Sequence, residues 1–99
     1  MRKLLGVVCC TFAFAGAAHA ADCNDGITAN AEGDYKKALE VLQPLAAGTD
    51  DCAQFHLGLM YLLGEGVKQD KVMARELFEK SSAKGNRAAK VQLDKLSKK

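Results

Sequence analysis

The feature that most constrains the fold is a pattern of residues that recurs at an interval of about 36 positions. N-cap, small and large apolar residues return in the same order, which is typical of stacked helix–turn–helix units. One such unit cannot cover its own apolar face, so neighbouring units must pack on each other. The matching pairs are Asp34 with Asp70, Ala38 with Ala74, Leu42 with Phe78, Ala53 with Ala89 and Leu57 with Leu93.

Every apolar run after residue 30 has the spacing of a helix rather than that of a strand. A shorter helix is expected within residues 24–32, and Pro44 should kink the first long helix or end it early. Asp34 and Asp70 are placed to cap helices, and Gly64 to end one. We predict an all-α fold, a short antiparallel helix-pair solenoid of about four to five helices. The apolar stripes occupy residues 35–46, 53–61, 74–81 and 89–96.

The first 20 residues have the pattern of a cleavable export signal. A positive start at residues 1–3 precedes an uncharged run over residues 4–18, and Ala18-His19-Ala20 forms an A-x-A cleavage site. The run is shorter than the roughly 18–20 residues that span a bilayer. We predict a signal peptide at residues 1–20, a domain at residues 21–99, and a periplasmic or secreted mature protein. The alternatives are a retained membrane anchor, a buried helix or a lipoprotein signal.

Two cysteines, Cys23 and Cys52, remain after the signal is removed. An even pair in a small exported chain indicates a disulfide. Closing a loop of roughly 30 residues stabilises the fold by about 3–4 kcal/mol in the chain-entropy model. The alternative is a metal site built from Cys23, Cys52 and His56, which lacks an obvious fourth ligand and any C-x-x-C spacing. We therefore expect neither a metal nor another cofactor.

The charges of the mature chain balance, but they are unevenly distributed. Residues 21–66 hold eight acidic and two basic residues, whereas residues 67–99 hold ten basic and four acidic residues. Such a separation can orient the approach of a charged partner; the alternative is two solvated faces without that role. Nucleic acid is not expected as a partner, because its recognition needs a strong net basic charge and usually exposed aromatic residues.

Residues 53–89 resemble the Sel-one-like repeat, a relative of the tetratricopeptide repeat that is common in exported bacterial proteins. The resemblance covers one full unit. In addition, residues 33–48 resemble the second helix of a preceding unit, and residues 86–96 the first helix of a following one. The residues that carry the motif are Leu57, Gly58, Met60, Tyr61, Gly64, Gly66, Val67, Asp70 and Ala74.

The resemblance implies an antiparallel helix-pair solenoid whose concave face binds a protein or peptide. Gly58 would permit close contact between helices, and Gly64 and Gly66 would give backbone freedom to a tight loop. Ser81 and Ser82 stand where the family usually has alanines. If they are buried, their hydroxyl groups need partners such as a carbonyl one turn back.

The favoured function is therefore a protein–protein interaction module of the bacterial cell envelope, acting as a scaffold, adaptor or inhibitor. Its expected partner is an envelope protein or peptide. Each candidate contact residue also has an alternative interpretation, as part of a solvated helix face. These candidates lie outside the apolar stripes of the first helices: Gln54, Phe55, His56, Lys90 and Gln92.

Three alternatives remain open. The first is an immunity protein that neutralises a toxin, because the charge separation suits fast association. The second is a β-lactam-binding or hydrolysing enzyme of the cysteine-rich repeat type, although the chain has no G-x-S-x-G motif and no second histidine after the signal. We expect it not to be an enzyme. The third is membrane-surface binding, which we expect less because these lysines form no clear amphipathic face with aromatic anchors: Lys90, Lys95, Lys98 and Lys99.

Overall fold

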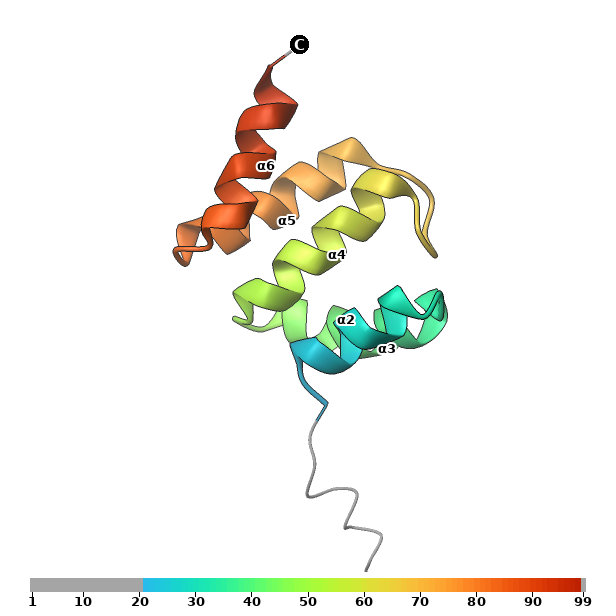
Figure 1. Cartoon of the computed structure of the whole chain (residues 1–99). Coiled ribbons are helices and arrows are strands. Elements are labelled where there is room, and N and C mark those ends of the chain that lie inside the picture. Colours follow the sequence, from blue (N-terminus) through green and yellow to red (C-terminus); the bar gives the residue numbers. More distant parts are fainter. Residues whose placement is uncertain (1–20, 99) are drawn as a thin grey trace, which may run out of the picture.

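A computed structural model describes residues 21–98, so the predicted signal peptide lies outside the described residues. This part of the chain is made of helices without strands, which confirms the predicted all-α class. Consecutive helices pack side by side, with α2 against α3, α4 against α5, and α6 against α5 (Figure 1). The five helices are α2 (Cys23–Ala31), α3 (Tyr35–Ala47), α4 (Asp51–Leu63), α5 (Lys71–Ala83) and α6 (Arg87–Ser97).

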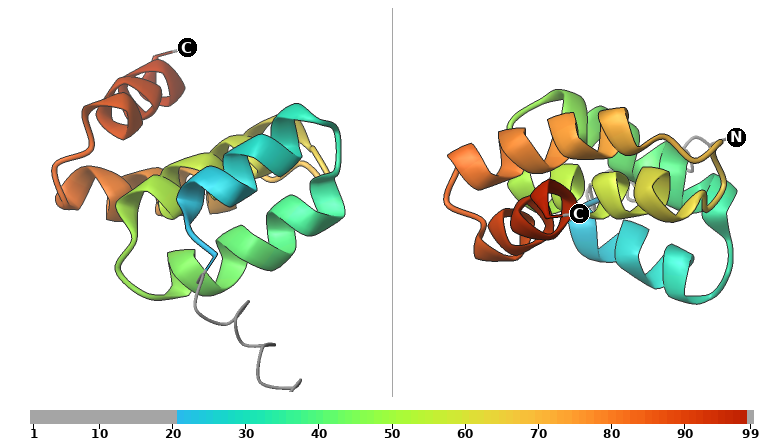
Figure 2. Two further views of the ribbon diagram at one scale, coloured as in Figure 1. Left: turned by 60° about the horizontal axis from the view of Figure 1, so that its bottom comes forward. Right: turned by 90° about the horizontal axis from the view of Figure 1, so that it is seen from above.

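The helices form two layers. Seen from above in Figure 2, α2, α4 and α6 lie on one side of the molecule, and α3 and α5 lie on the other. This arrangement follows from the order of the units, because each antiparallel connection returns the chain to the opposite layer. The first helices of successive units, α2, α4 and α6, therefore share one face of the molecule.

Each helix begins at a side chain that accepts a hydrogen bond from a backbone N–H of the first turn. Asp34 accepts from the N–H of Lys37 at 3.1 Å, and Asp70 accepts from that of Met73 at 3.0 Å. Such caps satisfy donors that have no partner within the helix. The predicted caps at Asp34 and Asp70 are therefore confirmed. The remaining N-caps are Asp22, Asp50 and Asn86.

Two apolar clusters fill the space between the layers. The first includes Leu42 and Met60, which are fully buried between α2, α3 and α4. The second surrounds Phe78, which is fully buried where α4, α5 and α6 meet. Gly58 allows this packing, because a Cβ atom there would lie 2.7 Å from Cε1 of Phe78. The expected role of Gly58 in close helix contact is confirmed.

The connection between α4 and α5 depends on two glycines in the left-handed region. Gly64 has φ of +72° and Gly66 has φ of +76°, conformations that side chains with a Cβ rarely adopt. Gly66 also lies directly on α3, since a Cβ there would be 2.6 Å from Cβ of Tyr35. The loop therefore turns tightly and touches the preceding unit, as the resemblance implies.

Pro44 does not end its helix early. Helix α3 continues through Ala47, three residues beyond the proline. Leu45 packs against the first cluster and Ala46 is buried, 6% exposed. Because Pro44 lies in the last turns, it removes one hydrogen bond near the helix end, while the packing of the residues after it keeps them helical.

Candidate binding surface

Helix α4 carries a second apolar line besides the stripe that enters the core. Phe55, Leu59 and Leu63 follow each other at intervals of four residues, so they lie along one side of the helix. Phe55 and Leu59 are half-buried against the second cluster, whereas Leu63 is 61% exposed. The line therefore runs from the core to the solvent.

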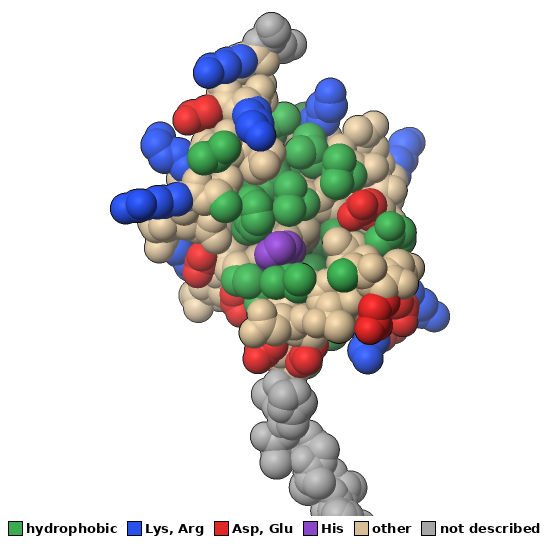
Figure 3. All heavy atoms as spheres, in the orientation of Figure 1, with side chains coloured by type: hydrophobic (Ala, Val, Ile, Leu, Met, Phe, Trp, Pro, Cys, Tyr) green, Lys and Arg blue, Asp and Glu red, His purple; other side chains and the backbone are tan. Residues whose placement is uncertain are grey.

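The neighbouring first helices also carry apolar residues that are partly exposed. Ile27 of α2 is half-buried and packs against the first cluster. Val91 of α6 occupies the position of Phe55 under the 36-residue shift and is 49% exposed. Figure 3 shows hydrophobic side chains gathered across the middle of this face. We call the surface formed by Ile27, Phe55, Leu59 and Leu63 the apolar groove.

His56 lies in the middle of this face. It is the purple side chain in Figure 3, since His19 lies outside the described residues. Its ring meets that of Phe55 edge to face, with 5.0 Å between the ring centroids. Burial lowers the pKa of His56 below its usual value of 6.5, because a charged imidazolium loses hydration there. The imidazole is therefore neutral at pH 7 and offers a polar group without a net charge.

The structure also brings together the three residues of the alternative metal site. The ligand atoms of Cys23, Cys52 and His56 all lie within 4.8 Å of one another. The two sulfur atoms, however, lie at disulfide distance, 2.02 Å apart, as the even cysteine pair predicts. Sulfur in a disulfide has no thiolate to offer a metal, so in this state only the imidazole could act as a ligand.

Gln54 does not lie on an open helix face. Its side chain is 1% exposed, and its Nε2 donates to the carbonyl oxygen of Ala46 at 3.1 Å. The same nitrogen lies 3.5 Å from the carbonyl oxygen of Gly48. These carbonyls belong to the end of α3, where helical partners are lacking. Gln54 therefore joins α4 to the end of α3, and its expected place at the surface is wrong.

The other predicted contact residues have the exposure that binding requires. Phe55 and His56 are half-buried at the groove, and Lys90 on α6 is exposed. Gln92 is half-buried and occupies the position of His56 under the 36-residue shift. Their role in binding a partner stays a prediction.

The order of these helices, the loop glycines and the residue motif match a known repeat family over residues 53–86. The match covers α4, α5 and the connection between them. Residues 53–86 are a Sel1 repeat. Neither the curated proteins nor the solved structures gave a match to this chain. Sel1 repeats are generally protein–protein interaction modules and are typically not enzymes.

Some residues of the apolar groove were not predicted from the sequence. The predicted stripe of α4 was a single one, and Leu59, Leu63 and Ile27 were not among the candidate contact residues. The available signal was that α4 has apolar residues on nearly every side. A helix that packs on one side only needs a single apolar stripe, so the additional apolar residues indicate a second contact surface.

One catalytic spacing in the Sel1 repeat was also overlooked. Ser81 and Lys84 have the S-x-x-K spacing of serine β-lactam enzymes. Ser81 is fully buried, and its Oγ donates to the carbonyl oxygen of Asp51 at 2.8 Å. This partner lies on α4 rather than one turn back on α5, so the expected local hydrogen bond is wrong. A buried hydroxyl held in this way connects helices and is not accessible to a substrate.

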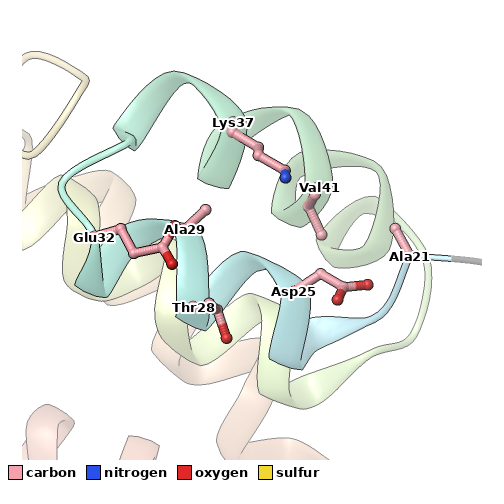
Figure 4. Close-up of a pocket in the computed structure, with 7 residues that line it drawn as sticks. All are labelled: Ala21, Asp25, Thr28, Ala29, Glu32, Lys37 and Val41. Atoms are coloured by element: carbon pink, nitrogen blue, oxygen red, sulfur yellow. The ribbon is translucent and has the colours of Figure 1, made fainter.

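A separate hollow of about 310 Å³ lies between α2 and α3 (Figure 4). Asp25 of α2, Glu32 directly after α2 and Lys37 of α3 line it together with smaller side chains. The Asp25 carboxylate already accepts a hydrogen bond from the N–H of Asp22, as part of the cap of α2. The Asp25 carboxylate is therefore already used in the cap of α2. The apolar groove is the better candidate for a binding site.

Proposed function

We propose that this chain is an exported interaction module of the bacterial cell envelope, which acts as a scaffold, adaptor or inhibitor by binding a protein partner in the apolar groove. One observation carries the proposal. Helix α4 carries an apolar line outside its core stripe, in which Leu63 is 61% exposed, and hydrophobic side chains gather around it on this face of the molecule (Figure 3). Single exposed apolar residues are common in proteins, but a continuous apolar surface is typical of an interaction site.

Two features of the sequence support the export part of the proposal. Residues 1–20 have the pattern of a cleavable signal, and the cysteines that remain after it form a pair. A disulfide persists in oxidising compartments such as the bacterial periplasm. In addition, none of the described helices has the length and hydropathy needed to cross a bilayer.

The groove can be tested with a charge placed at its most exposed apolar position. Leu63→Glu should leave the fold intact, because Leu63 is 61% exposed. Val72→Glu is the matched control: Val72 is 68% exposed and lies on α5, in the layer behind the groove. Purified wild-type protein and both variants are used to capture cell-envelope proteins, and the affinity for each captured partner is then measured.

We expect Leu63→Glu to weaken partner binding by about tenfold or more, since a charge replaces an apolar contact that the partner would bury. Val72→Glu should bind like the wild type. Circular dichroism melting curves check that all three proteins are equally folded. Equal affinities of the two variants for every captured partner would contradict the assignment of the groove.

A further inference from the structure

We propose that reduction of the Cys23–Cys52 disulfide creates a binding site for a thiol-binding cation, Cu⁺ or Zn²⁺, with His56 as the third ligand. In the disulfide state the sulfur atoms offer no thiolate to a metal, so the expectation of no metal concerns that state. The inference goes beyond the proposed function and does not depend on it, because the site binds a small ion rather than a protein partner.

Two helices bring the three ligand atoms together. Cys52 and His56 are four residues apart on α4, so their side chains lie on the same side of the helix. Cys23 begins α2, and its Cα lies 6.1 Å from that of Cys52. All three ligand atoms lie within 4.8 Å of one another. Zinc bond lengths place neighbouring ligand atoms roughly 3.5–3.8 Å apart, so rotation of these side chains is enough to enclose an ion once the disulfide is reduced.

Each of the three ligands is available for a metal after reduction. Cys23 is the first residue of α2 and Cys52 the second residue of α4. The N-terminus of a helix carries a partial positive charge, which favours the thiolate form of a cysteine there. Within residues 21–98, no hydrogen bond engages the ring nitrogens of His56, so one of them is free to bind an ion.

The charges around the site favour a cation. Neither α2 nor α4 contains a lysine or an arginine. Asp22 and Asp51, in contrast, are the direct chain neighbours of the two cysteines. Two thiolates close to these carboxylates repel each other and the carboxylates, and a bound cation offsets that repulsion. The reduced site is therefore more favourable with a cation than without one.

The reaction balances with a thiol as the reductant. Two thiol molecules supply two electrons and two protons and are joined in a new disulfide, while Cys23 and Cys52 become thiols. The cation then displaces both thiol protons and binds two thiolates and one imidazole nitrogen. Thiolate sulfur is a soft ligand that selects Cu⁺ and Zn²⁺, and imidazole suits both metals. Zn²⁺ held by two cysteines and a histidine takes water as its fourth ligand, for which the half-buried Cys52 and His56 leave access.

The experiment compares metal binding by the reduced and the oxidised protein. Every protein carries Cys9→Ser and Cys10→Ser, so that Cys23 and Cys52 supply the only thiols. One sample is reduced without oxygen, the reductant is removed, and Zn²⁺ and Cu⁺ are titrated separately against a coloured chelator. We expect one ion per reduced chain, bound about a hundredfold or more tightly than by the oxidised chain, which lacks thiolates. Equal binding by both states, or no binding of either ion, would overturn the inference.

The role of His56 is tested by a substitution that leaves both thiols in place. His56→Gln should weaken binding of the ion by more than the roughly tenfold that loss of an outer-shell partner costs. Gln92→Ala is the matched control, because Gln92 occupies the position of His56 under the 36-residue shift and lies on α6. It should bind the ion like the wild type. If His56→Gln binds both ions as tightly as the wild type, the imidazole is not a ligand and the inference is wrong.

The stability of the reduced protein gives a second readout, because reduction removes a covalent link. Circular dichroism compares melting of the reduced chain with and without each ion. An ion that binds the folded arrangement raises the melting temperature, or restores the helices if the reduced chain has unfolded. Binding that changes neither would mean that the ion binds thiols of an unfolded chain, which would also overturn the inference. Leu63→Glu should bind the ion like the wild type, so this inference and the proposed function can fail separately.

Discussion

The two helix pairs, α2–α3 and α4–α5, use the same packing device but are stabilised differently. In both pairs a glycine of the first helix faces a large buried side chain of the second: Gly26 faces Leu42, and Gly58 faces Phe78. The two large residues correspond under the 36-residue shift. Helix α2, however, has 9 residues, whereas α4 has 13.

The difference in length explains why a disulfide ties α2, the short helix of the first pair, to α4 of the second pair. The buried residues of α2 are Cys23, Gly26 and Ala29, all of them small. Helix α4 buries Leu57 and Met60 in addition to small residues. A short helix with little buried apolar surface contributes few favourable contacts, so a covalent link to α4 has the larger effect there.

Removal of the disulfide should have the largest effect on stability. Replacing Cys23 and Cys52 together by alanine should lower the free energy of unfolding by about 3–4 kcal/mol, because the unfolded chain regains the entropy of an open loop. Urea unfolding of the variant and the wild type measures the change. Hydrogen exchange should increase more in α2 than in α5. Equal exchange in both helices would show that the disulfide does not act on the first pair in particular.

The next largest loss of stability is expected at the two packing glycines, Gly58 and Gly26, and it should differ between them. Gly58→Ala would place Cβ 2.7 Å from the ring of Phe78, and Gly26→Ala would place it 2.5 Å from Cδ2 of Leu42. The rigid ring of Phe78 has few alternative positions, whereas Cγ and Cδ2 of Leu42, 2.6 and 2.5 Å away, can move together when that side chain changes rotamer. We expect Gly58→Ala to cost about 1–3 kcal/mol by overpacking, partly offset by about 1 kcal/mol of helix propensity.

Gly26→Ala should cost less, because Leu42 can change rotamer. Thermal melting of both variants under one set of conditions gives the order. A larger loss for Gly26→Ala would mean that the first pair, despite its shorter helix, is the more rigidly packed.

A smaller and equal effect is expected at the two corresponding caps. Asp34→Ala and Asp70→Ala each remove a side chain that accepts one N–H in the first turn of a helix. Each should cost about 1 kcal/mol. Glu79→Ala, at an exposed position inside α5, is the control and should change stability little. If urea unfolding gives clearly different losses of unfolding free energy for Asp34→Ala and Asp70→Ala, the two units are not equivalent.

The smallest effect concerns the pH dependence of stability. Burial lowers the pKa of His56 in the folded state below 6.5. The unfolded state then binds more protons between the two pKa values, so the free energy of unfolding falls as the pH decreases through 6.5. His56→Gln should remove this part of the slope, while the carboxylate contributions remain in both proteins. Identical slopes between pH 7 and 5 would contradict the burial of the imidazole.

Most of the local structure follows from residue patterns. The stripes, the caps at Asp34 and Asp70 and the loop glycines at Gly64 and Gly66 were predictable, because each depends on neighbours within a few residues. The pairing of Cys23 with Cys52 followed from the cysteine count and the expected export. The predicted stripe over residues 35–46 runs past Pro44, but the sequence did not decide whether the proline ends the helix, since that depends on what Leu45 and Ala46 meet in the core.

The binding surface was harder to predict than the helices. Phe55 and His56 were identified because they lie outside the core stripe of α4. Gln54 satisfies the same criterion but is buried, since the end of α3 approaches it and provides carbonyl acceptors. Leu59 and Leu63 belong to the groove only because α2 and α6 come to lie on either side of α4.

The amino-acid sequence alone was enough to specify the helices, their ends and the repeated order of small and large residues, because these depend on interactions between residues close in the chain. The tertiary structure decided which sides of the helices remain open. Exposure depends on the elements that pack from distant parts of the chain: Ser81 contacts Asp51 across 30 residues, and Phe55 and Leu59 are half covered by residues of α5 and α6. The apolar line on α4 becomes a surface for a partner only in that arrangement.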